Sequence, residues 1–200
     1  AGRPLMSWSI RAFDRSDKVG HIVVVCPAER RAEMRRLAID PFDYDTPISF
    51  ADAGDTRQDS TRAGVHAVPA GFEYVAIHDG ARPLLPLQVA MDGWIMAAEE
   101  GAAIPVVPPT DSLRVLEEDG DASKPVDRSR FRCVQTPQVF RAHILMDAYS
   151  RPDQEEFTDD AAAIEAAGYF VDLFLGHPHN IKITNPGDLE IAEVLLRLMK

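Results

Sequence analysis

The stretch "IHDGARP" places a carboxylate, a glycine and a guanidinium directly after the apolar run "YVAI". Asp79 is expected at the carboxyl end of a strand, where parallel sheets bind ligands. A carboxylate there suits Mg²⁺ that bridges the phosphates of a nucleotide. Gly80 permits close approach of backbone, and Arg82 offers a planar fork to a phosphate. The same residues also suit a plain turn, because Asp-Gly and Arg-Pro are good turn pairs.

Two other segments place polar groups where helices are expected to begin. The segment "GDTRQDSTRAG" offers Gly54, Asp55 and Ser60, and a small residue and a hydroxyl at a helix start can contact polar ligand atoms. The alternative is a helix capped by Asp59 or Ser60 with a solvated charged face. In "FTDDAAAIEAAG", Thr158 is the expected N-cap, and a cap explains it fully.

A lysine and two histidines lie near the carboxyl end of the chain. In "NIKIT", Lys182 alternates with Ile181 and Ile183, so on a strand it lies on the opposite face. Such a lysine is either an ordinary surface residue or a fixed cation above a site. His177 and His179 favour a loop over a metal pair, because no carboxylate or cysteine spacing supports a metal.

Strands and helices must alternate to bring these groups together. Apolar runs predict strands at 21–27, 47–52, 74–83, 102–109, 170–176 and 180–184. Helical spacing predicts helices at 5–13, 28–39, 86–101, 141–150, 158–168 and 186–199, with another after the loop that begins at residue 54. This alternation indicates βαβ units on a parallel sheet.

One segment interrupts the alternation. Residues 109–135 contain two extended pieces around an acidic, glycine-containing turn, which predicts a protruding hairpin or arm. The arm leads into "CVQTPQVF", where Thr136 and Pro137 are followed by Gln138. On residues alone this is a Thr-Pro start to the next helix.

Composition excludes several classes of protein. The chain has 200 residues, 46% apolar and 26% charged, which suits one soluble globular domain. Its net charge of -11 argues against a nucleic-acid binder, so a phosphate site must gather its own arginines and lysines. No apolar run is long enough for a membrane span or a signal peptide. Two cysteines without framework spacing suit a reducing, cytoplasmic compartment.

Six blocks together resemble one family. The blocks "GDTRQDSTRAGV", "IHDGARPLL", "PPTDSLR", "VQTPQVF", "FTDDAAAIEAAG" and "NIKITNPGDLEIAE" occur in the order seen in 2-C-methyl-D-erythritol 4-phosphate cytidylyltransferases. The resemblance spans the chain and implies a three-layer, doubly wound, mostly parallel α/β fold of the nucleotide-diphospho-sugar transferase type. It also implies a homodimer joined by the arm, with part of each site completed by the partner. The implied reaction couples CTP to methylerythritol phosphate and releases pyrophosphate, in non-mevalonate isoprenoid synthesis.

The resemblance also implies roles for individual residues. Nucleotide contacts are expected from Gly54, Asp55, Ser60 and Gly80, and Mg²⁺ binding from Asp79. Contacts to the polyol phosphate are expected from Arg82, Ser112, Thr136 and Thr158, while Arg128 and Lys182 position the attacking phosphate. In "VQTPQVF", Thr136 is expected to present its hydroxyl to substrate, Pro137 to set the chain direction, and Gln138 to satisfy nearby backbone.

The sequence departs from the family at its beginning. Family members start with a strand and a Gly-rich loop that carries an Arg and a Lys, whereas "AGRPLMSWSIRAF" resembles the family's segment after that loop. We therefore expect further residues upstream of Ala1. A central strand outside this sequence would expose unpaired backbone on its two neighbours. Two other functions stay open: a cytidylyltransferase for another polyol phosphate, such as ribitol 5-phosphate, and a catalytically inactive dimeric relative.

Overall fold

Short apolar strands form the central sheet. The computed structural model describes residues 1–117, 120, 122–151 and 157–198. The strands of this sheet are β3 (Tyr74–Ile77), β8 (Gln138–Arg141), β4 (Ala102–Val107), β7 (Cys133–Val134) and β9 (Asp172–Leu175). β8 lies between β3 and β4, while β7 and β9 both pair with β4.

The long strands of this sheet mostly run in one direction. β3 and β4 are each antiparallel to β8 and therefore parallel to one another, and β9 is parallel to β4. The predicted α/β fold with a mostly parallel sheet is confirmed. β8 was not predicted as a strand, because "TPQVF" was taken as the approach to a helix.

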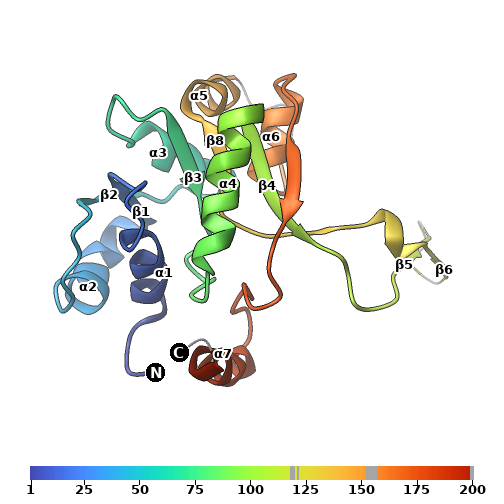
Figure 1. Cartoon of the computed structure of the whole chain (residues 1–200), viewed down its shortest axis with the longest axis horizontal. Coiled ribbons are helices and arrows are strands. Elements are labelled where there is room, and N and C mark those ends of the chain that lie inside the picture. Colours follow the sequence, from blue (N-terminus) through green and yellow to red (C-terminus); the bar gives the residue numbers. More distant parts are fainter. Residues whose placement is uncertain (118–119, 121, 152–156, 199–200) are drawn as a thin grey trace.

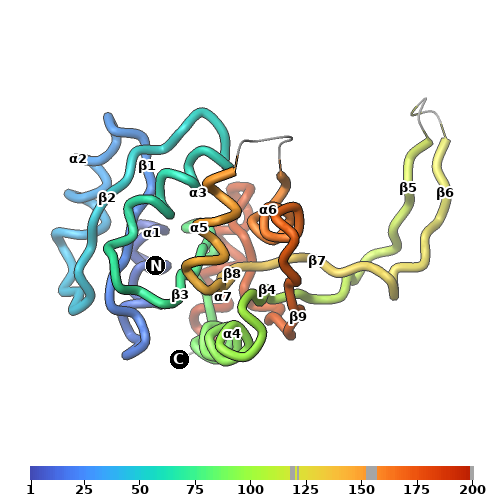
Figure 2. The backbone as a smooth tube through the Cα atoms, turned by 90° about the horizontal axis from the view of Figure 1, so that it is seen from above, coloured from blue at the N-terminus to red at the C-terminus, as the bar shows by residue number. Residues whose placement is uncertain are grey.

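Helices cover both faces of the sheet and complete three layers (Figures 1 and 2). One face packs against α3 (Arg57–His66), α5 (Ala142–Ser150) and α6 (Asp160–Ala166), around a core that includes Phe140, Leu145 and Ile164. The other packs against α4 (Leu87–Glu100), with Phe13 of α1 (Leu5–Asp14) at its margin. Neighbouring residues of β8 serve opposite cores, since Phe140 faces one and Val139 the other.

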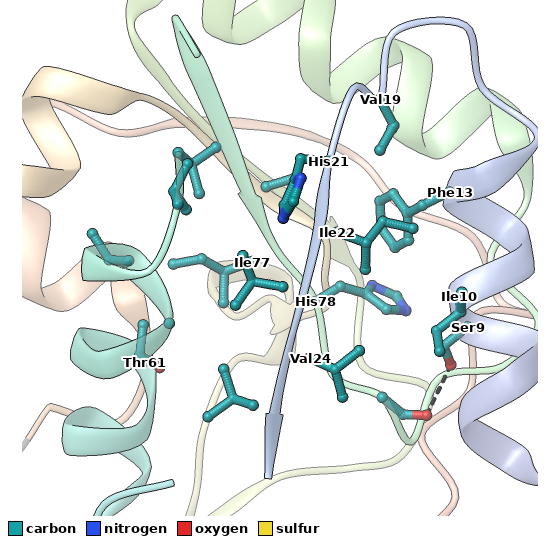
Figure 3. Close-up of a pocket in the computed structure, with 18 of the residues that line it drawn as sticks. Ser9, Ile10, Phe13, Val19, His21, Ile22, Val24, Thr61, Ile77 and His78 are labelled. Atoms are coloured by element: carbon teal, nitrogen blue, oxygen red, sulfur yellow. Dashed lines mark hydrogen bonds between the residues drawn. The ribbon is translucent and has the colours of Figure 1, made fainter. Parts of the chain in front are cut away.

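A second, smaller sheet stands beside the first. β1 (Ile22–Cys26) pairs in parallel with β2 (Ile48–Asp52). A cavity of about 380 Å³ separates it from the central sheet, and consecutive residues of both β1 and β3 line that cavity (Figure 3). Since side chains of a strand alternate between faces, lining by consecutive residues means that strand edges border the cavity. Among the described residues β1 pairs only with β2, and β3 pairs only with β8.

Several predicted boundaries need correction. α3 begins at Arg57 and is capped by Thr56, not by Asp59 or Ser60; Asp59 instead completes a capping box with Thr56. α6 is capped by Asp159, not by Thr158. The predicted strand at 180–184 is absent, because those residues pair with no strand and have no regular structure.

Two other predicted helices are less regular or less buried than expected. Residues 28–39 form η1 (Ala28–Arg30), the α-helical turn α2 (Arg31–Met34) and the π-helix η2 (Arg35–Ile39). α7 (Pro186–Leu198) starts at the expected proline and buries Ala192, but its Leu189 is half exposed. Met199, the last residue of the predicted helix, lies outside the described residues. No helix in the described part of the chain is both long enough and apolar enough to cross a membrane.

The arm extends away from the three layers (Figures 1 and 2). Its antiparallel strands are β5 (Arg114–Leu116) and β6 (Ser123–Pro125), followed by the short helix η3 (Arg128–Arg130). Residues 118, 119 and 121 of the predicted arm lie outside the described residues. The hairpin predicted within 109–135 is therefore present, and its Val115 and Leu116 are exposed.

Candidate active site

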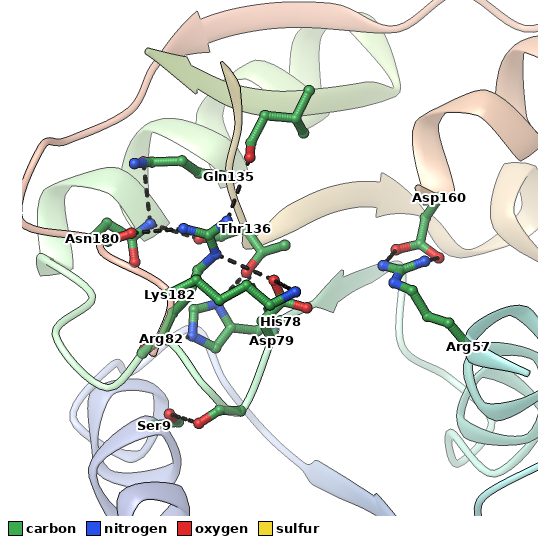
Figure 4. A network of polar contacts seen from close by, with 12 residues as sticks. Ser9, Arg57, His78, Asp79, Arg82, Gln135, Thr136, Asp160, Asn180 and Lys182 are labelled. Carbon is green, nitrogen blue, oxygen red and sulfur yellow. Dashed lines mark hydrogen bonds and ion pairs between the residues drawn. The ribbon is translucent and has the colours of Figure 1, made fainter. Parts of the chain in front are cut away.

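Two cations from distant segments converge on one carboxylate at the carboxyl end of β3. The Lys182 Nζ lies 3.1 Å from Asp79 Oδ2, and the Arg82 Nε lies 3.2 Å from the same oxygen (Figure 4). Lys182 reaches this position without a strand, because the backbone N–H of Ile183 donates to the carbonyl oxygen of Ala81 at 2.8 Å. The bond holds segment 180–184 against the loop after β3.

The cations keep Asp79 ionised. Burial by itself would raise the pKa of the Asp79 carboxyl, but Lys182 and then Arg82 outweigh it, so the pKa lies below its usual value. The Lys182 side chain remains 45% exposed, so its ammonium can also meet an anion from solvent. Locally the protein is thus able to receive phosphate despite its net charge of -11.

A chain of hydrogen bonds beneath Asp79 sets the direction of its loop. The backbone N–H of Asp79 donates to Thr136 Oγ1, which lies 3.0 Å from His78 Nδ1; His78 Nε2 lies 3.0 Å from the carbonyl oxygen of Arg82. A carbonyl accepts, so Nε2 donates, and Nδ1 of the neutral ring accepts from the threonine hydroxyl. Thr136 is almost fully buried, and its hydroxyl therefore contacts the protein on both sides.

His78 is neutral at ordinary pH. Burial lowers the pKa of its imidazole to about 4, although the Arg82 carbonyl and the Asp79 charge act in the opposite direction. The ring also packs edge-on against Phe13 of α1, with centroids 5.0 Å apart.

A buried amide fastens Arg82 and the loop that carries Lys182. Asn180 is fully buried, and its Nδ2 donates to the carbonyl oxygen of Thr136 at 2.8 Å. The backbone carbonyl of Asn180 accepts from Arg82 Nη1 at 2.8 Å. Arg82 Nη2 lies 3.4 Å from the carbonyl oxygen of Val134, so Arg82 joins three segments.

The nucleotide segment predicted at the start of α3 folds on itself. The backbone N–H of Gly54 donates to Ser60 Oγ at 3.1 Å. A Cβ at Gly54 would collide with the Cβ of Asp59 and would lie 3.1 Å from its carbonyl carbon, so glycine is required by this close approach. Asp55 is exposed beside it. Ser60 lines the same cavity as Asp79 and Gly80, so these predicted residues border one space.

The start of α6 lies against the start of α3. Asp160 is fully buried and is held by Arg57, whose Nη1 and Nη2 lie 3.1 Å and 2.6 Å from its two carboxylate oxygens. Thr158, two residues earlier, is exposed. Gln138 of β8 accepts from the backbone N–H of Ala161 at 3.2 Å, so the prediction that Gln138 satisfies nearby backbone is confirmed.

Two predicted site residues lie on the arm, within its predicted range of 109–135. Ser112 and Arg128 are exposed, and Arg128 donates to the carbonyl oxygen of Thr110. No bond among the described residues joins either of them to Asp79. The structure therefore groups Asp79 with Gly80, Arg82, Thr136 and Lys182 and leaves Ser112 and Arg128 on the outer surface.

The Asp79 carboxylate also has an oxygen suited to a hard cation. Lys182 and Arg82 both contact Oδ2 of Asp79, which leaves Oδ1 as the oxygen that could bind Mg²⁺. Within the described part of the chain no cluster of three or more His, Cys, Asp or Glu residues could hold a metal. A single carboxylate fits Mg²⁺, which commonly binds through one carboxylate plus substrate phosphates.

Some residues of the site were not found from sequence. Asn180 and Gln135 are buried and donate to backbone carbonyls distant in sequence, while His78 is hydrogen-bonded to the distant Thr136 side chain. Neither residue type nor spacing signals such contacts. Arg57 and Asp160 lie in two of the segments quoted above, and no role was predicted for either. The one available signal was that Asp160 falls at an expected helix start.

Comparison with known proteins points to one family. The family model described as 2-C-methyl-D-erythritol 4-phosphate cytidylyltransferase matches residues 1–198. The curated protein of that name from Syntrophotalea carbinolica is 40% identical over 198 residues, which cover 97% of this chain and 84% of that protein. The one from Caldanaerobacter subterraneus subsp. tengcongensis is 36% identical over 199 residues, covering 98% and 88%.

Comparison with solved structures points to the same family and fold. The crystal structure of 2-C-methyl-D-erythritol 4-phosphate cytidylyltransferase from Thermus thermophilus has a TM-score of 0.81 and 33% identity, and the match covers 98% of this chain and 90% of that chain. The 4-diphosphocytidyl-2C-methyl-D-erythritol synthase from Anaerococcus prevotii, at 22% identity, shares the fold with a TM-score of 0.88.

His78 is expected to make stability depend on pH. Its pKa is about 4 in the folded state and about 6.5 unfolded, so between these values the unfolded chain binds a proton that the folded chain does not. The free energy of unfolding should therefore fall as pH drops from 6.5 to 4, by up to about 3 kcal/mol from this group. In urea unfolding, His78→Gln should lose less stability over that range than wild type; parallel curves would exclude this role.

Two glycines are expected to respond differently to the same substitution. Gly54→Ala should cost about 1–3 kcal/mol of stability and weaken nucleotide binding, because the new methyl meets Asp59 backbone and side chain. Gly80→Ala should cost less than about 1 kcal/mol, because its methyl meets the mobile end of Met6 at 2.5 Å. Thermal unfolding and nucleotide titration of both variants check this, and equal losses would contradict it.

Proposed function

The chain belongs to the 2-C-methyl-D-erythritol 4-phosphate cytidylyltransferase family, and we propose that it couples CTP to 2-C-methyl-D-erythritol 4-phosphate. The products are CDP-methylerythritol and pyrophosphate, in the non-mevalonate route to isoprenoids. The chain is thus an enzyme, a nucleotidyltransferase. The observation that carries the proposal is the convergence of Lys182 and Arg82 on Asp79, beside the cavity that Ser60 also lines.

The proposed reaction needs positioned cations more than a nucleophilic side chain. An oxygen of the polyol phosphate attacks the α-phosphorus of CTP, the new P–O bond forms, and the bond to the β-phosphate breaks so that pyrophosphate leaves with the electron pair. The attacking phosphate is already largely ionised near neutral pH, so no base is required. Catalysis then depends on alignment of the two anions and on neutralisation of their charge.

We assign the attacking phosphate to Lys182 and Arg128. The Lys182 ammonium is held by Asp79 at 3.1 Å while nearly half of its side chain stays open, so it can hold an anion at a defined position. Arg82 and Thr136 belong to the same site, where they set the position of Asp79 through their bonds to it. Thr158 and Ser112 would supply exposed hydroxyls to the polyol.

We assign the nucleotide to the opposite side of the same space. Gly54 and Asp55 precede α3, Ser60 lies in its first turn, and Gly80 follows Asp79. Asp79 would hold Mg²⁺ through its Oδ1, and a bound Mg²⁺ would neutralise charge on the triphosphate. The lowered pKa of Asp79 supports this assignment, because a metal ligand must be ionised.

We propose that two copies of the chain share their sites. Ser112 and Arg128 are exposed on the arm, which extends away from the central sheet (Figure 1). Exposed apolar residues on the same arm, Val115, Leu116 and Phe131, would be covered by a partner. The ligands are small anions, and the acidic net charge disfavours nucleic acid. Two free cysteines support a reducing compartment such as the cytoplasm.

Substitution of Lys182 tests the proposed chemistry. Lys182→Ala should lower kcat with methylerythritol phosphate by about 100-fold or more, because a charge-stabilising contact is lost. The midpoint of thermal unfolding should hardly change, because the side chain is half exposed. Arg36→Ala, which removes an exposed cation from η2, is the matched control and should keep full activity.

Pyrophosphate release from CTP and Mg²⁺ is the assay, run with methylerythritol phosphate and separately with ribitol 5-phosphate. Faster turnover of ribitol 5-phosphate than of methylerythritol phosphate would identify ribitol 5-phosphate as the substrate. Wild-type protein that releases pyrophosphate with neither, and does not bind CTP, would support the inactive relative.

Mixed subunits test the shared site. Arg128→Ala and Lys182→Ala proteins should each be nearly inactive, but a mixed dimer contains one site with both native residues. After random exchange of subunits, half of the dimers are mixed, so about a quarter of wild-type activity should return. Recovery should follow the rate of subunit exchange. Dimers that exchange subunits without any recovery would place Arg128 and Lys182 in the same chain's site or outside it.

A further inference from the structure

An ion pair between the buried carboxylate of Asp160 and the partly exposed Arg57 joins the starts of α3 and α6, which are about a hundred residues apart in sequence. Asp160 has no exposed surface, and Arg57 meets both of its oxygens, at 3.1 Å and 2.6 Å. The Tyr149 hydroxyl donates to the same carboxylate at 2.6 Å. The carboxylate is thus held by three hydrogen bonds, two of them to one planar guanidinium.

Neighbouring bonds make the connection rigid. The backbone N–H of Phe157 donates to Gln58 Oε1 at 3.0 Å, next to the ion pair. The backbone N–H of Ala161 donates to Gln138 of β8, so the start of α6 is also fastened to the sheet. The two helix starts therefore hold one another at two adjacent residues, and the sheet holds one of them.

Stability alone does not account for a charge in this position. Removing a carboxylate from water is costly, and an apolar pair of similar volume often stabilises a protein at least as well. A buried ion pair does, however, admit one geometry, because the guanidinium and the carboxylate must lie in one plane. Asp160 and Arg57 are thus suited to fixing the starts of α3 and α6 relative to one another.

Arg57 and Asp160 lie between the segment assigned to the nucleotide and the segments assigned to the polyol phosphate. Arg57 lines the same cavity as Asp79, and Figure 4 shows the ion pair beside the group formed by Asp79 and Lys182. Burial would lower the pKa of Arg57, but the bonds and charge of Asp160 outweigh it and raise that pKa. Arg57 therefore stays charged while it is held.

We propose that Asp160 is a positioning residue for cytidylyl transfer. Through Arg57 it holds segment 54–60 in register with Thr158, so that the nucleotide and the polyol phosphate meet in line. The inference rests on the proposed function, which assigns those segments to the two substrates. Each segment can still bind its own substrate without the ion pair, but misplacement by about 1 Å slows the reaction by about a hundredfold.

Two variants test the proposal. Asp160→Asn keeps the shape of the side chain and removes its charge, while Arg57→Lys keeps the charge and removes the fork. Each should lower kcat by about 10- to 100-fold and change either KM by less than about threefold. The double variant should be no slower than the slower single variant, because both substitutions break one interaction.

Ile164→Ala is the matched control, because Ile164 is fully buried in α6 and outside the ion pair. Below its unfolding transition it should keep wild-type kcat even though it unfolds at a lower temperature. Loss of kcat in this control equal to that in Asp160→Asn would reduce the ion pair to a stabilising contact. If Asp160→Asn does not fold, Arg57→Lys carries the same comparison.

Hydrogen exchange gives a readout that does not need turnover. Amides of segment 54–60 should exchange faster in Asp160→Asn and Arg57→Lys than in wild type, and at the wild-type rate in Ile164→Ala. Active wild type together with unchanged kcat in both variants overturns this inference and leaves the proposed function intact. Inactive wild type refutes the proposed function, and unchanged exchange would then overturn the coupling of the segments as well.

Discussion

The shared carboxylate of Asp79 is the contact on which the rest of the site depends. Lys182 and Arg82 both meet its Oδ2, so one partly buried charge sets the place of two cations that come from distant parts of the chain. Without it the two cations would repel each other and Lys182 would be an ordinary surface residue. The same pairing keeps the carboxylate ionised although burial disfavours its charge.

Hydrogen bonds between uncharged groups connect the Asp79 loop to the sheet. Thr136 accepts from the backbone N–H of Asp79, and His78 is hydrogen-bonded both to Thr136 and to the carbonyl oxygen of Arg82. Since β8 begins two residues after Thr136 and pairs with β3, the carboxylate is anchored to two adjacent strands. A second charged contact, Arg57 with Asp160, ties together the two helix starts on the other side of the cavity.

Local sequence predicted most elements and several of the site residues correctly. Apolar runs and helical spacing identified the strands β1, β3 and β4 and the helices α1 and α4, because burial on one or both faces leaves a periodic record. Prediction from local sequence failed where several neighbouring residues could play the same role. Thr56, Asp59 and Ser60 can all cap a helix, and only the structure shows that Thr56 does so, with Asp59 completing the capping box.

The sequence by itself determined the fold class, the family and the residue types able to hold phosphate. Tertiary structure decided that β8 lies between β3 and β4, that Lys182 meets Asp79 from an irregular segment, and that Asp160 is buried against Arg57. The physical reason is that periodicity records which faces are buried but not which segment covers them. Partners a hundred residues apart meet only when the whole chain folds, as Arg57 and Asp160 do.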